Sequence, residues 1–172
     1  MKQKGFTLVE LLAVIAIIGV IAAVILVNLT SARSKSRDAR RLADIYQFQK
    51  ALELYYDDNK QYPPSTGATA PNSSWSNSND SSWATLQTEL VPYLSLLPID
   101  PSQSSSGWAG AGQFSYAYFS TGYGCNRQWF MIVILLERAS GPDPGVKACD
   151  GTVFQYGGAG ANTAIKTFGH AQ

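Results

Sequence analysis

The first feature of the chain is an almost unbroken apolar run over residues 6–29, whose only polar side chains are Thr7, Glu10 and Asn28. As a helix this run would measure roughly 36 Å, enough to cross the hydrocarbon core of a bilayer. A cleavable secretory signal is the main alternative, but its apolar core is shorter and ends at a small-residue cleavage site, which this run lacks. The pattern therefore predicts a membrane-spanning helix, although an ordinary anchor leaves the carboxylate of Glu10 unexplained.

Helical spacing continues beyond this run, where apolar side chains recur on one face of residues 30–58. Neither glycine nor proline occurs between Gly19 and Pro63, so we predict one helix over about 6–58. It would be about 80 Å long. Its first half is apolar on all sides and its second half is amphipathic. The second half is expected to pack against a folded head through Leu42, Ile45, Gln49, Leu52 and Tyr56, widened by Ala39, Tyr46, Phe48 and Tyr55.

The remaining sequence predicts a small head with one helix and one sheet. Apolar spacing indicates a short helix over 83–97, and strand-like runs follow at 114–120, 129–137 and 152–156. The run at 129–137 is nearly all apolar, as expected for a central strand that is covered on both faces. We expect three or four antiparallel strands packed against the amphipathic half of the long helix, which is an α+β fold.

Two segments of the head show little packing pattern. Residues 65–82 are rich in Ser, Asn, Thr and Gly and are predicted to form an exposed loop. Asn72 and Asn79 begin glycosylation sequons there, but such triplets arise often by chance in Asn- and Ser-rich sequence. The Gly- and Ala-rich tail 157–172 is predicted to be mobile or to contact another subunit.

Composition narrows the classes of function. The formal net charge is +1. Charged residues make up 15% of the chain, against a typical ~25%. These values exclude a basic nucleic-acid-binding protein and, with two cysteines, a disulfide-dense mini-protein. Residues 61–112 carry only the charges of Asp80, Glu89 and Asp100, which is typical of exposed surface rather than of a catalytic cleft. Asp100 precedes a proline and is interpreted as a turn former.

The sequence contains no catalytic constellation. It has no histidine in a nucleophile motif with Ser or Cys, no phosphate-binding glycine loop and no pair of carboxylates in a recognisable motif. Cys125, Cys149 and His170 do not make a metal-ligand set. We therefore expect a structural protein rather than an enzyme, with no cofactor and no metal.

One string in the N-terminal segment is highly specific. Residues 4–12, Lys-Gly-Phe-Thr-Leu-Val-Glu-Leu-Leu, resemble the class III signal of type IV pilins and type II secretion pseudopilins. The resemblance implies that a prepilin peptidase cuts between Gly5 and Phe6 and N-methylates the new terminal Phe6. It also implies that Glu10 neutralises the terminal amine of the neighbouring subunit and so sets register during assembly. Cleavage after Gly5 would indeed create a positive charge four residues before Glu10.

Two further strings resemble the same family less specifically: the Tyr-rich helix end running into Tyr-Pro at 54–64, and Leu-x-Pro-Tyr-Leu followed by Leu-Pro-x-Asp-Pro at 90–101. The resemblance implies the pilin fold and three parts. These are a cleaved leader, 1–5; a transmembrane or filament-core half of the helix, 6–29; and the amphipathic half with the globular head, 30–172.

The family also implies partners and location. The partners are further copies of the chain in a helical filament, the prepilin peptidase, the assembly machinery of a pilus or secretion system, and the lipid bilayer before assembly. The chain would be a single-pass membrane protein first, and then part of an extracellular filament or a periplasmic pseudopilus.

A basic cluster follows the apolar run and allows three interpretations. It could be a solvated helix face that contacts lipid headgroups, or it could pair with acidic groups such as Asp57 and Asp58 of another subunit. Phosphate or nucleic-acid binding is the least favoured, since no aromatic residues are interleaved with the cations. The candidate contact residues are Arg33, Lys35, Arg37, Arg40 and Arg41.

Two expectations for the head follow from the family. In an exported head of this kind, Cys125 and Cys149 are expected to form a disulfide worth about 3 kcal/mol. Major pseudopilins carry a calcium loop near the C-terminus, but here Asp143 and Asp150 lack the expected acidic cluster, so calcium is disfavoured.

The favoured function is a structural subunit of a type IV pilus-like filament, held in the membrane before assembly. The first alternative is a pseudopilin of a type II secretion or DNA-uptake machine. The second is a membrane-anchored binding module that never polymerises, and a secreted enzyme is the least favoured.

Overall fold

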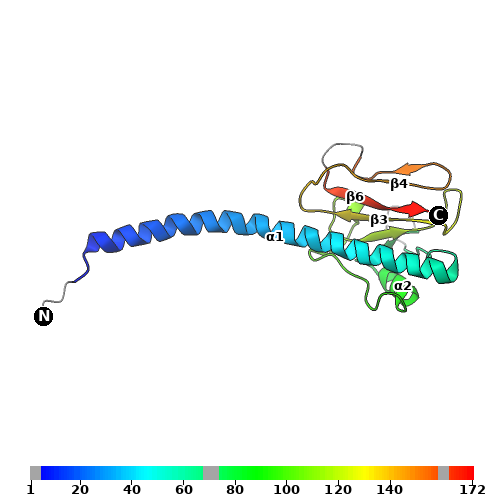
Figure 1. The fold of residues 1–172 in the computed structure, drawn as a ribbon, viewed down its shortest axis with the longest axis horizontal. Helices are drawn as coiled ribbons and strands as arrows, with labels where there is room; N and C mark the ends of the chain where they lie inside the picture. The colour runs from blue at the N-terminus through cyan, green and yellow to red at the C-terminus, as the bar shows by residue number, and fades with distance from the viewer. Residues whose placement is uncertain (1–4, 68–73, 159–162) are drawn as a thin grey trace. The chain divides into compact units, whose positions relative to one another are not determined.

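The computed structural model describes residues 5–67, 74–158 and 163–172, and the side chains of residues 24–28 are not described. The predicted leader residues 1–4 and the first sequon residue, Asn72, lie outside this part. The chain divides into two compact units, Met1–Ser36 and Arg37–Gln172. The elements are α1 (Leu8–Asn59), β1 (Ser76–Asn77), α2 (Ser81–Leu90), a 3-10 turn (Ala109–Ala111), β2 (Ala117–Phe119), β3 (Trp129–Leu135), β4 (Val146–Lys147), β5 (Val153–Phe154) and β6 (Ile165–Ala171), drawn in Figure 1.

The long helix is confirmed, because α1 spans Leu8–Asn59 without interruption. It ends where Lys60 takes a left-handed conformation, with φ of 56°, and donates its backbone N–H to the Tyr56 carbonyl at 2.7 Å. Two prolines follow in the next turn, and together these features form an ordinary helix stop. Among the described residues, no helix combines the length and hydropathy needed to cross a membrane. The membrane-spanning role of residues 6–29 stays a prediction.

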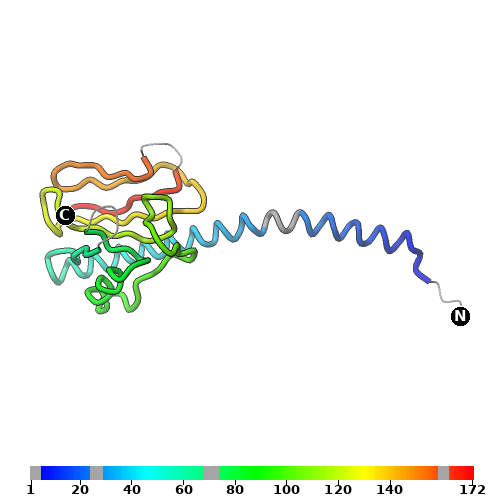
Figure 2. Tube along the Cα trace, turned by 180° about the vertical axis from the view of Figure 1, so that it is seen from behind, coloured from blue at the N-terminus to red at the C-terminus, as the bar shows by residue number. Residues whose placement is uncertain are grey.

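The α+β layout is also confirmed. A four-stranded antiparallel sheet has the order β1-β2-β3-β6, and β4 and β5 form a separate two-stranded sheet. The strand β3 is central and pairs with β6 over its whole length, from Trp129 opposite Ala171 to Leu135 opposite Ile165. Figure 2 shows the two strands running side by side.

Both faces of the sheet are buried, which explains why β3 has almost no polar residue. Alternate side chains of a strand point to opposite faces. Phe130, Ile132 and Ile134 join a core formed with α1 and α2, whereas Trp129 and Met131 join a second, aromatic core beneath the β4–β5 hairpin. In Figure 1, the part of α1 after residue 36 lies across one side of this sheet.

The buried stripe of α1 differs from the predicted face. Within the head, Ile45, Phe48 and Leu52 are buried as expected, but Leu42 is 44% exposed and Tyr46 is 71% exposed. The buried positions are 38, 41, 45, 48, 51, 52 and 55, and apart from the small Ala51 they follow a regular three-four spacing. The prediction missed this register because the first two positions of the stripe are charged residues.

The sequence predicts little packing for two segments, 65–82 and 157–172, but parts of both belong to the folded head. Trp75, within the predicted exposed loop 65–82, is 1% exposed, and the next two residues form the edge strand β1. Within the predicted mobile tail 157–172, residues 165–171 form β6. Its Gly169 lies so close to the Phe130 carbonyl that a Cβ atom would clash there.

Other boundaries were drawn too wide. The short helix α2 ends at Leu90 rather than at 97, because Pro92 stops it. The strand expected over 114–120 is regular only over Ala117–Phe119, and the one over 129–137 only over Trp129–Leu135. The run at 152–156 contributes only Val153–Phe154, in the second sheet.

Candidate assembly site

The predicted cleavage point lies in exposed backbone ahead of the helix. Gly5 and Phe6 precede the first residue of α1, and Phe6 is 80% exposed. A Cβ atom added at Gly5 would meet no atom within 4 Å. Contacts with the described residues therefore do not require a glycine at this position, and cleavage after Gly5 stays a prediction.

Thr7 and Glu10 form a capping box at the start of α1. The Thr7 backbone N–H and hydroxyl donate to Glu10 Oε2 at 2.9 and 2.7 Å, and the Glu10 N–H donates to Thr7 Oγ1 at 3.3 Å. This reciprocal arrangement satisfies backbone donors that a helix start leaves open. Both hydrogen bonds to the carboxylate use the same oxygen, so Oε1 has no hydrogen-bond partner among the described residues.

The helix after this cap exposes apolar side chains on every side. A helix that is apolar all round is found buried, in a membrane or among other helices. In the N-terminal unit nothing described covers these residues, whose exposed fractions lie between 46% and 80%. They are Phe6, Leu8, Val9, Leu11, Leu12, Val14, Ile15, Ile17, Ile18, Val20 and Ile21.

The predicted basic contact patch is wrong for Arg41. Its side chain is fully buried and makes a bidentate pair with Asp100, with both N–O distances at 2.8 Å. A third nitrogen binds Asp38 Oδ1 at 2.8 Å and Glu137 Oε1 at 3.0 Å. Three carboxylates of the head thus neutralise Arg41, because a buried guanidinium must be paired.

Arg37 is also turned to the head rather than free. Its guanidinium binds both oxygens of Glu137, at 2.5 and 2.6 Å. Hydrogen bonds from Arg37 first, and then from Arg41, lower the pKa of Glu137 to about 2. Asp38 completes the cluster by accepting the backbone N–H groups of Glu137 and Arg138 at 2.8 and 3.2 Å.

The other three basic residues are exposed. Arg33 and Lys35 belong to the N-terminal unit, and neither makes an ion pair with a described residue. Arg40 is 62% exposed and lies 3.8 Å from Asp44, which is a weak surface pair. A contact role for these three stays a prediction.

Sequence reasoning missed the acidic half of the ion cluster. The Asp100 side chain does form the expected turn, by accepting the Ser102 N–H at 2.7 Å, but it is also the buried partner of Arg41. A signal was available, because Asp100 and Glu137 are isolated carboxylates beside apolar runs. The sequence alone could not show that Arg41 pairs with Asp100, 59 residues away, and with Glu137, 96 residues away.

The structure joins Cys125 to Cys149, with their Cα atoms 5.7 Å apart. The bridge links the loop before β3 to the turn between β4 and β5. The Asp150 N–H donates to the Tyr123 carbonyl at 3.1 Å beside it. The disulfide therefore fastens the β4–β5 hairpin over the aromatic core.

The region around Asp143, which the sequence offered for calcium, holds a group of buried hydrogen bonds. Asp143 is 2% exposed and accepts the Thr167 N–H at 2.5 Å and the Thr167 hydroxyl at 2.8 Å. Beside it, the Lys166 ammonium donates to the carbonyls of Gly141 and Pro142 at 2.6 and 3.0 Å. Burial lowers the pKa of Lys166. In the described part of the chain, no three His, Cys, Asp or Glu side chains are grouped to hold a metal.

A long N-terminal helix followed by a head with a small antiparallel sheet is consistent with the fold of type IV pilins and pseudopilins. Residues 1–26 match the family described as "Prokaryotic N-terminal methylation motif". The predicted resemblance to this class is thereby confirmed for the N-terminal part of the chain.

Part of the chain is also similar in sequence to individual proteins of type II secretion systems. The chain is 42% identical over 62 residues to "Type II secretion system core protein G" of Escherichia coli (strain K12), covering 36% of this chain and 43% of the relative. It is 39% identical over 62 residues to the protein of that name from Pectobacterium carotovorum subsp. carotovorum, covering 36% and 40%, and 37% identical over 62 residues to that from Aeromonas hydrophila, covering 36% and 43%. The chain thus spans less than half the length of these relatives, and no solved structure matches it.

Proposed function

We propose that the protein is a structural subunit of a type IV pilus-like filament, of the pseudopilin kind rather than of a surface pilus. The observation that carries the proposal is the exposed apolar helix that begins with the Thr7–Glu10 cap. The names of the relatives favour the pseudopilin alternative over the surface pilin.

The proposed assembly step depends on one carboxylate. Cleavage after Gly5 gives Phe6 a positively charged amine, and N-methylation keeps that charge. Oε2 of Glu10 is occupied by Thr7, whereas Oε1 is open to accept the Phe6 ammonium of a neighbouring copy. A charge pair among apolar helices is strongly preferred over an unpaired charge, so it would fix the register between subunits.

The apolar residues 6–29 would be covered in two successive surroundings. Before assembly they would be held in the bilayer, and the prepilin peptidase would remove residues 1–5. After assembly, the helices of other copies would cover them. Residues 30–172 would remain outside the membrane, in the periplasm for a pseudopilus. Partners would be the peptidase, further copies of the chain and the secretion assembly machinery.

The direct test is mass spectrometry of the protein isolated from assembled filaments. The expected result is a chain that begins at N-methylated Phe6, whereas an intact N-terminus with no filaments would support the non-polymerising binding module. Shearing of cells then separates the two filament types. A surface pilus would be released in quantity, and a pseudopilus would stay with the envelope.

A pair of variants tests the role of the charge. Glu10→Gln keeps an acceptor for the Thr7 cap and removes the negative charge, and Thr7→Ser keeps both. We expect Glu10→Gln to remain a stable membrane-associated protein that enters filaments poorly, and Thr7→Ser to assemble normally. Normal incorporation of Glu10→Gln would contradict the register role.

A further inference from the structure

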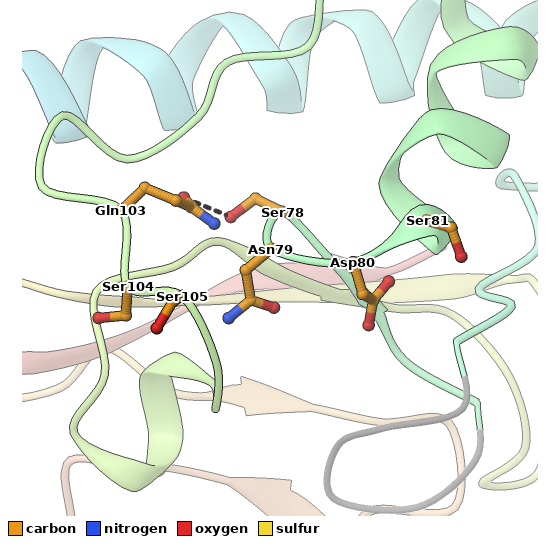
Figure 3. A pocket seen from close by; sticks show the side chains of 7 residues that line it. All are labelled: Ser78, Asn79, Asp80, Ser81, Gln103, Ser104 and Ser105. Carbon is orange, nitrogen blue, oxygen red and sulfur yellow. Dashed lines mark hydrogen bonds between the residues drawn. The ribbon is translucent and has the colours of Figure 1, made fainter.

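A hollow of about 640 Å³ opens on the surface of the head, apart from the N-terminal segment. Two strips of chain line it: the turn from β1 into α2, and the loop after Asp100. Figure 3 shows these strips facing one another across the open space. The lining residues are Ser78, Asn79, Asp80, Ser81, Gln103, Ser104 and Ser105.

Hydrogen bonds hold both strips in place. The Ser78 hydroxyl donates to Gln103 Oε1 at 3.0 Å and accepts the Tyr116 N–H at 2.8 Å, which joins the strips to the sheet. The Asn79 amide donates to the Gly107 carbonyl at 2.6 Å. Phe114 and Ser104 fix the far strip through two further hydrogen bonds. The hollow is thus formed before any ligand arrives, which favours binding.

One buried polar atom without a partner, Nε2 of Gln103, belongs to a residue that lines the hollow. All the buried side-chain polar atoms that lack a partner in the described part of the chain belong to Asn77, Gln103 and Ser115. Gln103 lines the hollow, Asn77 precedes the lining Ser78, and Ser115 precedes Tyr116, which binds Ser78. Asn77 and Ser115 are fully buried. Buried polar groups are nearly always hydrogen-bonded, so the Gln103 amide requires a partner that the described part of the chain does not supply.

The orientation of Gln103 is fixed by its neighbours. Its Oε1 accepts both the Ser78 hydroxyl and the Asp100 N–H, at 3.0 and 3.3 Å. A backbone N–H can only donate, so the oxygen must face it and Nε2 must face away. That leaves a buried N–H donor at the wall of the hollow. On the rim, the hydroxyls of Ser81 and Ser105 make no hydrogen bond with any described residue and complete a mixed set of donors and acceptors.

The lining also decides the charge of the ligand. It contains no lysine, arginine or histidine to bind an anion, and no apolar side chain to bind an apolar group. Its one carboxylate, Asp80, already accepts the N–H and the hydroxyl of Ser82 as the cap of α2. From this chemistry we infer that the hollow is a binding site for a neutral, hydroxyl-rich ligand, namely the edge of a carbohydrate.

The test is a nuclear magnetic resonance titration of the solubilised full chain with two neutral sugars, chitotriose and maltotriose. The expected result is saturable movement of the Gln103 side-chain amide signals with one of them. Ser105→Arg places a long side chain over the hollow from an exposed position and should weaken the affinity by about tenfold or more. Ser106→Arg, one residue along and not in the lining, should bind as the wild type does.

Three results would overturn the inference. The first is the absence of movement with either sugar, which would mean that ordered water alone satisfies the unpaired atoms. The second is equal binding by Ser105→Arg and the wild type. The third is movement of these signals with calcium chloride or inorganic phosphate but with neither sugar. None of them bears on filament assembly, so this inference and the proposed function fail or hold separately.

Discussion

At the scale of single residues, the most informative contact is the Thr7–Glu10 capping box. Glu10 has a role inside its own chain, since it satisfies the first turn of α1. Removing it therefore changes two things at once, the cap and the charge. Assembly defects of a Glu10→Ala variant cannot be assigned to charge alone, and variants of Thr7 separate the two effects.

Thr7→Val keeps the shape of the side chain and removes the hydroxyl that binds Glu10. Loss of a cap costs about 1 kcal/mol, so the first-turn amides of α1 should exchange about fivefold faster with deuterium. Hydrogen exchange on the solubilised full chain measures this effect, with Thr7→Ser as the control. Unchanged exchange in Thr7→Val would mean that the cap does not stabilise the helix start.

The buried Arg41 gives a second prediction at this scale. Arg41→Met removes the cation and leaves three carboxylates near one another, which should lower the free energy of unfolding by about 3–5 kcal/mol. Arg40→Met, one residue earlier and exposed, should change it by less than about 0.5 kcal/mol. Denaturant unfolding of the full chain checks both. Equal stability of the two variants would contradict the structural role of the cluster.

At the scale of elements, the ion cluster fastens α1 to the end of β3 and to the loop before residue 101. Its stability should depend on pH through Glu137, whose pKa in the folded chain is about 2 against 4.5 ordinarily. The folded state binds this proton less readily than the unfolded state. The stabilisation is therefore complete above about pH 4.5 and is lost as the pH falls toward about 2.

Unfolding measured across this acidic range should show the loss in the wild type. Glu137→Gln should be less stable near neutral pH but should lose less stability on acidification, because it has no proton to gain. Parallel pH profiles for the two proteins would show that Glu137 is not the responsible group. The other carboxylates, which both proteins share, would then account for the slope.

The elements also show what the sequence could and could not predict. The long helix was predictable because an apolar first half runs into helical spacing and neither Gly nor Pro occurs between Gly19 and Pro63. The strand β3 was predictable because a strand covered on both faces is continuously apolar. The strand β6 was not predictable, because its residues are held by contacts with distant parts of the chain. Thr167 donates to Asp143, and the ring of His170 lies against that of Phe130. For the candidate assembly site, the family string predicts Gly5, Phe6 and Glu10, and these roles stay predictions, whereas the paired state of Arg41 could be read only from the fold.

At the scale of the whole molecule, the two sides of the sheet are stabilised differently. One side is covered by α1, and a large apolar core between the helix and the sheet stabilises it. The other is covered by a short hairpin whose attachment includes the Cys125–Cys149 bridge and the aromatic rings beneath it. The hairpin side is therefore the part of the head that depends on oxidation.

Replacing both cysteines with serine should cost about 3 kcal/mol of stability. The loss should begin at the hairpin, so amides near Phe154 should exchange faster before those of α1 do. Hydrogen exchange with peptide resolution measures the order of opening. Uniform loss of protection would contradict a local role for the bridge.

The position of β6 has a consequence for how the head is made. The central strand β3 acquires its second neighbour only from residues 165–171, which are synthesised well after β3 itself. Pairings between distant segments form late because loop closure must come first. The sheet of the head thus stays incomplete until residues 165–171 have been made, whereas the helix α1, which needs only local contacts, can form first.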